Sequence, residues 1–216
     1  MTRDATATRE KLLRAAEHLF ARHGLDVPIR EIHAFAGQRN ASAIQYHFGG
    51  KDEVIEAILE RHRPTPEAMA AIRADLLSKK DEPRRFVEAI VRRQCAYLVD
   101  EEARDYVRVG FHLMQQASMR RILAEGSDHY TLAAVWAEHD LVRAALPGLP
   151  DRIVRERAVA GMSFIVFEVA ERARLIDDGQ AEVLLDEEEF IVNLVDTATA
   201  LLTAPSTLVA PKAFKS

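Results

Sequence analysis

The sequence has little of what several protein classes require. Its 216 residues include a single cysteine, Cys95, so no intrachain disulfide can form and nothing calls for an oxidising compartment. No stretch of about 18 uncharged apolar residues exists for a membrane span, and residues 1–4 lack the apolar core of a signal peptide. With 9 Gly and 8 Pro the chain is neither fibrous nor of low complexity. We therefore expect a folded protein of the cytoplasm without membrane contact.

Signatures of catalysis and of cofactor binding are also missing. The sequence has no GxSxG segment, no glycine-rich phosphate loop and no paired CxxC motif. We accordingly expect neither an enzyme nor a cofactor. Several metal-ligating side chains occur in the second half, but their spacing matches no metal site, and a metal or haem sensor stays only an alternative; they are His112, Asp128, His129, His139 and Asp140.

The net charge of −5 is unevenly distributed along the chain. Residues 1–63 hold ten Lys and Arg against nine Asp and Glu, a net charge of +1, together with five of the 8 histidines. Residues 64–216 hold nineteen basic against twenty-five acidic residues, a net charge of −6. The relatively basic part, where contact with nucleic acid is expected if it occurs, is the N-terminal one.

Apolar residues recur at helical spacing along the N-terminal part. We predict a long helix over 8–23, a short one that has Pro28 in its first turn and ends before Gly37, a very short one over 41–47 and a fourth over 51–62. Asn40 is expected to cap the very short helix. Pro64 and Pro66 then interrupt the pattern, which predicts a domain of residues 1–63 followed by a second of residues 64–216.

The second part also reads as helical, with no convincing strand pattern and a frayed tail over 204–216. Asp151 is expected to cap the longest of its helices. The sequence therefore predicts an all-α protein, and the further helices are expected at 66–77, 83–99, 104–123, 127–146, 151–176 and 186–202.

The order of the first four helices is that of a helix-turn-helix in a three-helix bundle, with the very short helix presented outward. Three segments resemble the tetracycline-repressor (TetR) family: Ile29-Arg-Glu-Ile32, Ala36-Gly37 and the run from Tyr46-His47-Phe48 to Ile55. The resemblance covers roughly residues 8–62. It implies a DNA-binding N-terminal domain, a larger C-terminal helical bundle for ligand binding and dimerisation, and repression relieved by a small effector. Activation, or a dimeric module without specific DNA binding, are the alternatives.

Two departures from the family pattern bear on DNA contact. Between Ala36 and Phe48 the chain has one residue more than is common, within Gln38-Arg39-Asn40, which leaves the first base-reading residue open. Between Gly24 and Ile32 it has one residue fewer, and Pro28 replaces a usual hydroxyl side chain that touches phosphate.

Candidate DNA contacts follow from direction and chemistry. If Ile44 and Phe48 face the bundle, Ala41, Ser42 and Gln45 are left to face base edges, and Gln45 suits a bidentate contact to adenine. The resemblance implies phosphate contacts for Tyr46, His47 and Lys51. Arg30 and Arg39 are added on chemistry alone.

The C-terminal part offers two further predictions. The helix over 151–176 is apolar on too wide a surface for one core, and with the last helix it is expected to form a homodimer interface through Val159, Phe167, Ala170, Phe190, Leu194 and Leu201. A mostly apolar effector pocket with a few polar groups is expected among Tyr97, Phe111, His112, Met114, Gln115, Met119, Trp136, His139, Phe164 and Phe167. Each of these could equally be an ordinary core residue. The mixture indicates a hydrophobic effector with one polar end.

Overall fold

A computed structural model describes residues 3–115, 142–143, 145–146, 148–180 and 185–208. Every regular element within these ranges is helical, which confirms the predicted all-α fold. The N-terminal helices are α1 (Arg3–His23), α2 (Ile29–Phe35), α3 (Ala43–His47) and α4 (Lys51–Arg61). The helices that follow are α5 (Pro66–Ser78), α6 (Pro83–Cys95), the 3₁₀ turn η1 (Ala96–Leu98), α7 (Glu101–Gln115), α11 (Asp151–Asp177) and α12 (Glu187–Thr203).

Two clusters of buried apolar side chains organise these helices. The first, here the N-terminal core, joins α1 to α4 through residues such as Leu12, Phe20, Ile32 and Ile58. The second, the C-terminal core, joins α5, α6, α11 and α12. The division of the chain at residues 63 and 64 stays a prediction. One helix of the second part packs into both cores and so joins the two parts.

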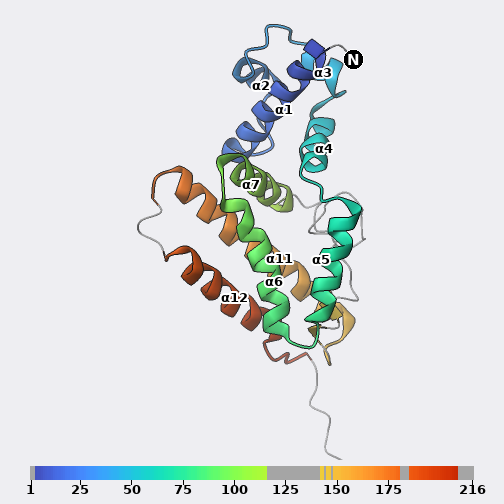
Figure 1. Cartoon of the computed structure of the whole chain (residues 1–216), viewed down its shortest axis with the longest axis vertical. Coiled ribbons are helices and arrows are strands. Elements are labelled where there is room, and N and C mark those ends of the chain that lie inside the picture. Colours follow the sequence, from blue (N-terminus) through green and yellow to red (C-terminus); the bar gives the residue numbers. More distant parts are fainter. Residues whose placement is uncertain (1–2, 116–141, 144, 147, 181–184, 209–216) are drawn as a thin grey trace, which may run out of the picture.

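That helix is α7, which lies between the N-terminal helices and the rest of the molecule (Figure 1). Tyr106, Val109 and Leu113, spaced by three and four residues, belong to the N-terminal core. Val107 belongs to the C-terminal core, and Phe111 packs against it. Since residues three or four apart share one face of a helix, α7 carries two different apolar faces and is buried on both.

The long helices α11 and α12 pack closely against each other. A Cβ atom added at Gly161 of α11 would lie only 2.9 Å from Cδ2 of Leu202 in α12. α12 starts at a capping box, in which Asp186 accepts the backbone N–H of Glu189 while the Glu189 carboxylate accepts that of Asp186. None of the helices that the structure describes is long and apolar enough to cross a bilayer.

Several predicted helix ends differ from the observed ones. The α-helix expected over 83–99 ends at Cys95 and continues as η1, and α7 begins at Glu101 rather than near residue 104. Pro150, not Asp151, is the N-cap of α11, because Pro150 keeps an extended backbone and Asp151 already belongs to the helix. The predicted stretches 116–123 and 127–141 lie outside the described residues.

Candidate DNA interface and its link to the C-terminal helices

The very short helix α3 is entered through a turn. Asn40 was expected to cap this helix, but the helix begins at Ala43 and its N-cap position is Ser42, which makes no side-chain cap. Instead, Oδ1 of Asn40 accepts the backbone N–H of Ser42 at 3.0 Å, and its carbonyl accepts that of Ala43 at 3.1 Å. The Asn40 prediction was therefore wrong, since asparagine stabilises turns by the same short-range bonds that it uses in caps. The extra residue of this segment falls before α3.

The cap of α3 comes from α2 instead. The backbone N–H of Ile44, in the first turn of α3, donates to Nε2 of His33 at 3.2 Å. First-turn N–H groups have no partner inside their own helix, so His33 satisfies a donor that would otherwise be buried and unpaired. His33 is itself buried. Nε2 can accept this bond only when it carries no proton itself. Sequence reasoning missed this residue.

The direction of α3 agrees with the geometry expected from Ile44. Its side chain is 1% exposed in the N-terminal core, and Phe48 packs against the same core. Ala41, Ser42 and Gln45 are exposed, and Tyr46 is exposed to 78% of its surface. All four residues are therefore accessible to solvent. Their contacts to DNA stay predictions.

The candidate phosphate contacts differ in exposure. Arg30 and Arg39 are exposed, whereas His47 and Lys51 are half-buried. Nζ of Lys51, the first residue of α4, lies 5.7 Å from the centroid of the Phe20 ring. Nδ1 of His47 is buried without a hydrogen-bond partner among the described residues, so a phosphate contact from this ring would use Nε2.

The candidate pocket residues do not all gather in one place. The Phe111 ring lies 5.6 Å from that of Phe167 and 5.5 Å from that of His112. His112, however, points toward α1, where its Nε2 lies 3.3 Å from the carbonyl oxygen of Ala21. Tyr97, Met114 and Phe164 are half-buried against the C-terminal core, and Gln115 is exposed. Met119, Trp136 and His139 lie outside the described residues.

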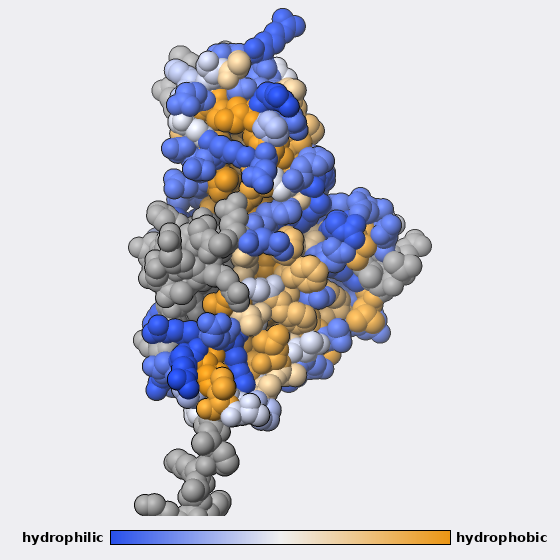
Figure 2. All heavy atoms as spheres, turned by 180° about the vertical axis from the view of Figure 1, so that it is seen from behind, coloured by the Kyte–Doolittle hydropathy of each residue, from blue (hydrophilic) through white to orange (hydrophobic). Residues whose placement is uncertain are grey.

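The candidate dimer residues divide by burial. Ala170 is buried and Leu194 packs inside the C-terminal core of the single chain, so their side chains offer little surface to a partner. Phe167 is 45% exposed, and Val159, Phe190 and Leu201 are half-buried. Figure 2 shows that apolar surface is broad over the part of the molecule that holds α11 and α12. A dimer interface here stays a prediction, resting on the exposed members of the set.

Residues 12–58, from α1 to α4, match the family model described as "Bacterial regulatory proteins, tetR family". The N-terminal helices are thus similar to the corresponding segment of that family. No curated protein matches this sequence.

Solved structures resemble the chain over nearly its full length. NalD of Pseudomonas aeruginosa, the secondary repressor of the MexAB-OprM multidrug efflux pump, is 21% identical with a TM-score of 0.58, over 95% of this chain and 100% of that one. SmeT, the repressor of the Stenotrophomonas maltophilia multidrug efflux pump SmeDEF, is 19% identical with a TM-score of 0.51, over 96% and 98%. At such identities the likeness shows a shared fold and nothing more.

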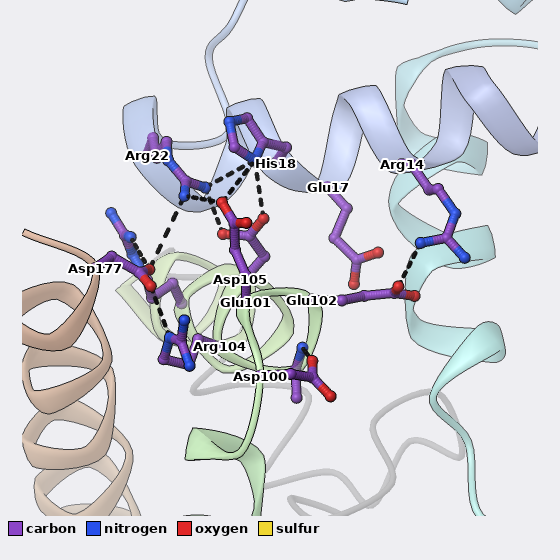
Figure 3. A network of polar contacts seen from close by, with 12 residues as sticks. Arg14, Glu17, His18, Arg22, Asp100, Glu101, Glu102, Arg104, Asp105 and Asp177 are labelled. Carbon is purple, nitrogen blue, oxygen red and sulfur yellow. Dashed lines mark hydrogen bonds and ion pairs between the residues drawn. The ribbon is translucent and has the colours of Figure 1, made fainter.

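A polar junction between α1, α7 and α11 was not predicted (Figure 3). Arg22 of α1 donates to Oδ1 of Asp105 at 2.5 Å and to Oε1 of Glu101 at 2.8 Å, both from α7. Nδ1 of His18 lies 3.1 Å from Oδ2 of Asp105. Burial raises the pKa of the Asp105 carboxyl, and the charges of Arg22 and His18 oppose that rise. Charged residues at helical spacing usually form a solvated face, so no sequence pattern indicates that these groups meet.

Polar contacts extend the junction toward α4. Arg61 pairs with Glu102 of α7 and, at 3.3 Å, with the buried carboxylate of Glu17. His62 lies 2.6 Å from the same Glu17 carboxylate, and its ring stacks on Tyr106 of α7 at 4.1 Å. An open cleft of about 660 Å³ borders this region, lined from α1, α2 and the start of α7. Polar contacts thus tie the N-terminal helices to α7 through both α1 and α4.

Proposed function

We propose that this protein is a sequence-specific transcriptional regulator that binds operator DNA as a homodimer and is released by a small hydrophobic effector. The observation that carries the proposal is the accessible face of α3 within a segment that matches the tetR family. A helix of this kind, presented outward from a compact bundle, fits the major groove of DNA. A regulator that reads DNA acts where the genome lies, so we place it in the cytoplasm, and we assign it no catalysis.

The individual contacts are proposed by chemistry. The Gln45 amide can pair with both N6 and N7 of adenine, and Ser42 and Ala41 can contact neighbouring base edges. Tyr46, His47 and Lys51, with Arg30 and Arg39, are proposed to bind the phosphates on either side. Phosphate contacts supply affinity and orientation, whereas base contacts supply sequence preference.

A dimer gives the arrangement its affinity. A two-fold pair places two α3 helices about one DNA turn apart, which predicts a palindromic operator. Phe167 and the neighbouring half-buried side chains of α11 and α12 are the apolar surface that a second copy would cover. Repression is favoured over activation because proteins of this fold, including NalD and SmeT, are described as repressors.

The effector is proposed to bind among the C-terminal helices near Phe111, Phe164 and Phe167. These rings would contact the apolar part of a ligand. Release of DNA then requires only that the ligand binds more tightly to a state in which the two α3 helices no longer match the operator.

The test is a footprint on the DNA upstream of the protein's own gene, at several salt concentrations, against a scrambled duplex. We expect a protected two-fold site. Gln45→Ala should lose about 1–3 kcal/mol of binding for each half of that site, whereas Gln180→Ala, also exposed and distant in sequence from α3, should lose nothing. Lys51→Ala should weaken binding to all sequences and lower the slope of log affinity against log salt by about 0.9 for each subunit, or about 1.8 for the dimer, while Lys80→Ala should leave the slope unchanged.

Failure would have a clear form. Equal, salt-sensitive affinity for every duplex in a genome-wide selection, unaltered by Gln45→Ala, would mean that α3 reads no bases. The protein would then be a dimeric module rather than a regulator.

A further inference from the structure

Arg22 stands where three helices meet. It belongs to α1, near the end that leads toward α2, and its guanidinium contacts Asp105 and Glu101 of α7. The same group lies 4.0 Å from Oδ2 of Asp177, the last residue of α11. Its Nη1 also lies 2.9 Å from Nδ1 of His18. One side chain of the DNA-binding helices therefore contacts both α7 and α11 (Figure 3).

Asp177 is held firmly on the other side of this contact. Its carboxylate accepts from Arg104 at 2.6 Å and from Arg108 at 3.2 Å, both on α7, and it is 9% exposed. Charge-assisted bonds at low exposure are among the stronger polar contacts in proteins. The end of α11 is thus fixed to the polar face of α7, and Arg22 reaches this assembly from α1.

The charges at the junction leave little room for a metal ion. Nδ1 of His18 and carboxylate oxygens of Glu101 and Asp105 lie within 4.8 Å of one another, a donor set that could suit a divalent cation. Arg22, however, already contacts all three side chains. Its guanidinium supplies the positive charge that these converging lone pairs require.

We propose that Arg22 is a positioning residue that fixes the DNA-binding helices relative to α7 and α11, and so relays the state of the C-terminal helices to α3. This regulatory role rests on the proposed function. Arg22 divides its donors between the carboxylates of α7, at 2.5 and 2.8 Å, and that of α11, at 4.0 Å. A shift of α11 along α7 would change that division and alter the tilt of α1.

The planar guanidinium is essential to this arrangement. It carries five donors in a fixed plane, so it can bond several acceptors at once. A lysine at this position would keep the charge but could not span Asp105, Glu101 and His18 together. The proposal therefore predicts that Arg22→Lys behaves like Arg22→Gln. If only a positive charge were needed at this position, Arg22→Lys would instead behave like the native protein.

The experiment measures the distance between two spin labels, one on α2 at Ala34→Cys and one on α12 at Asn193→Cys. Both positions are exposed. Cys95 needs no replacement, because burial raises the pKa of its thiol to about 12 and leaves it unreactive. Doubly labelled chains are diluted with unlabelled ones, so that only distances within one chain are recorded. Thermal unfolding is followed in parallel for every variant.

We expect a narrow distance distribution in the native chain and one about twofold broader in Arg22→Gln and Arg22→Lys. Asp177→Asn should broaden it as well, and the double variant should add little to the larger single effect. The matched control is Arg92→Gln, which removes a bidentate arginine–carboxylate pair between α6 and α12, to Glu188. It should leave the distribution unchanged.

Three results would overturn the proposal. An unchanged distribution in Arg22→Gln would show that Arg22 does not fix the DNA-binding helices. Broadening by Arg22→Gln but not by Asp177→Asn would remove the link to α11. A native chain that broadens in EDTA and narrows again with Zn²⁺ would assign the role to a metal ion. All three readouts are taken without DNA, so loss of operator binding in the footprint bears on the proposed function alone.

Discussion

Replacing His33 by alanine tests how the first turn of α3 is stabilised. The change deletes the acceptor of the Ile44 N–H bond, which is 3.2 Å long and buried. A buried donor left without a partner costs about 1–3 kcal/mol, and the lost imidazole adds the cost of a cavity. Nothing else in α3 can take over, because the helix has five residues and no side-chain cap. We therefore expect α3 to fray at its first turn.

Fraying should affect DNA binding more than it affects the rest of the fold. If the ordering of α3 must be restored on the operator, affinity falls by about 5- to 150-fold for a cost of 1–3 kcal/mol. Operator binding is measured by fluorescence anisotropy and unfolding by urea, both on His33→Ala. The control is His23→Ala, which alters an exposed histidine at the end of α1 and should change neither.

The conservative variant separates a hydrogen bond from mere packing. In His33→Gln the side-chain amide oxygen can reach the position of Nε2, so most of the operator affinity should return. Equal losses in His33→Ala and His33→Gln would refute the capping role and leave only a packing role. An unchanged affinity in His33→Ala would refute both.

Three further predictions concern the C-terminal helices. Gly161→Ala should destabilise the protein by about 1–3 kcal/mol in urea unfolding, because its Cβ would crowd Leu202. Burial lowers the pKa of His112 below its usual 6.5; the unfolded chain then binds a proton that the native one does not, so the unfolding free energy should fall as the pH drops below about 6.5, and less steeply in His112→Gln. Phe167→Glu should turn the proposed dimer into monomers in sedimentation velocity, where an unchanged dimer would place the interface elsewhere.

Periodicity and punctuation were sufficient to predict most of the helices. The apolar spacing predicts α1, α4 and α12. The burial of Ile44 determines which residues of α3 face outward, because successive side chains are rotated by a constant angle around a helix. Cap residues predicted the starts of helices less reliably. Asn40 illustrates why: an asparagine forms a turn or a cap with nearly the same local bonds, and only the surrounding fold selects between them.

Contacts between helices were beyond the reach of sequence reasoning. The bond from Ile44 to His33 depends on the angle at which α2 and α3 meet, which no local pattern encodes. Arg22 and Asp105 are separated by more than eighty residues, and each reads in the sequence as one charge on a polar face. Only the packing of α1 on α7 brings them together and buries Asp105.

The two apolar faces of α7 explain why such a polar junction matters. Val109 is buried in the N-terminal core and Val107 in the C-terminal core, so α7 cannot move against one core without disturbing the other. Its remaining polar face carries Glu101, Asp105 and Arg108, which meet charges from α1 and α11. Packed apolar cores are not continuously deformable, and hydrogen-bonded ion pairs change partners when the helices that carry them shift. The packing thus joins the two parts, and the ion pairs give their relative orientation a small number of preferred values.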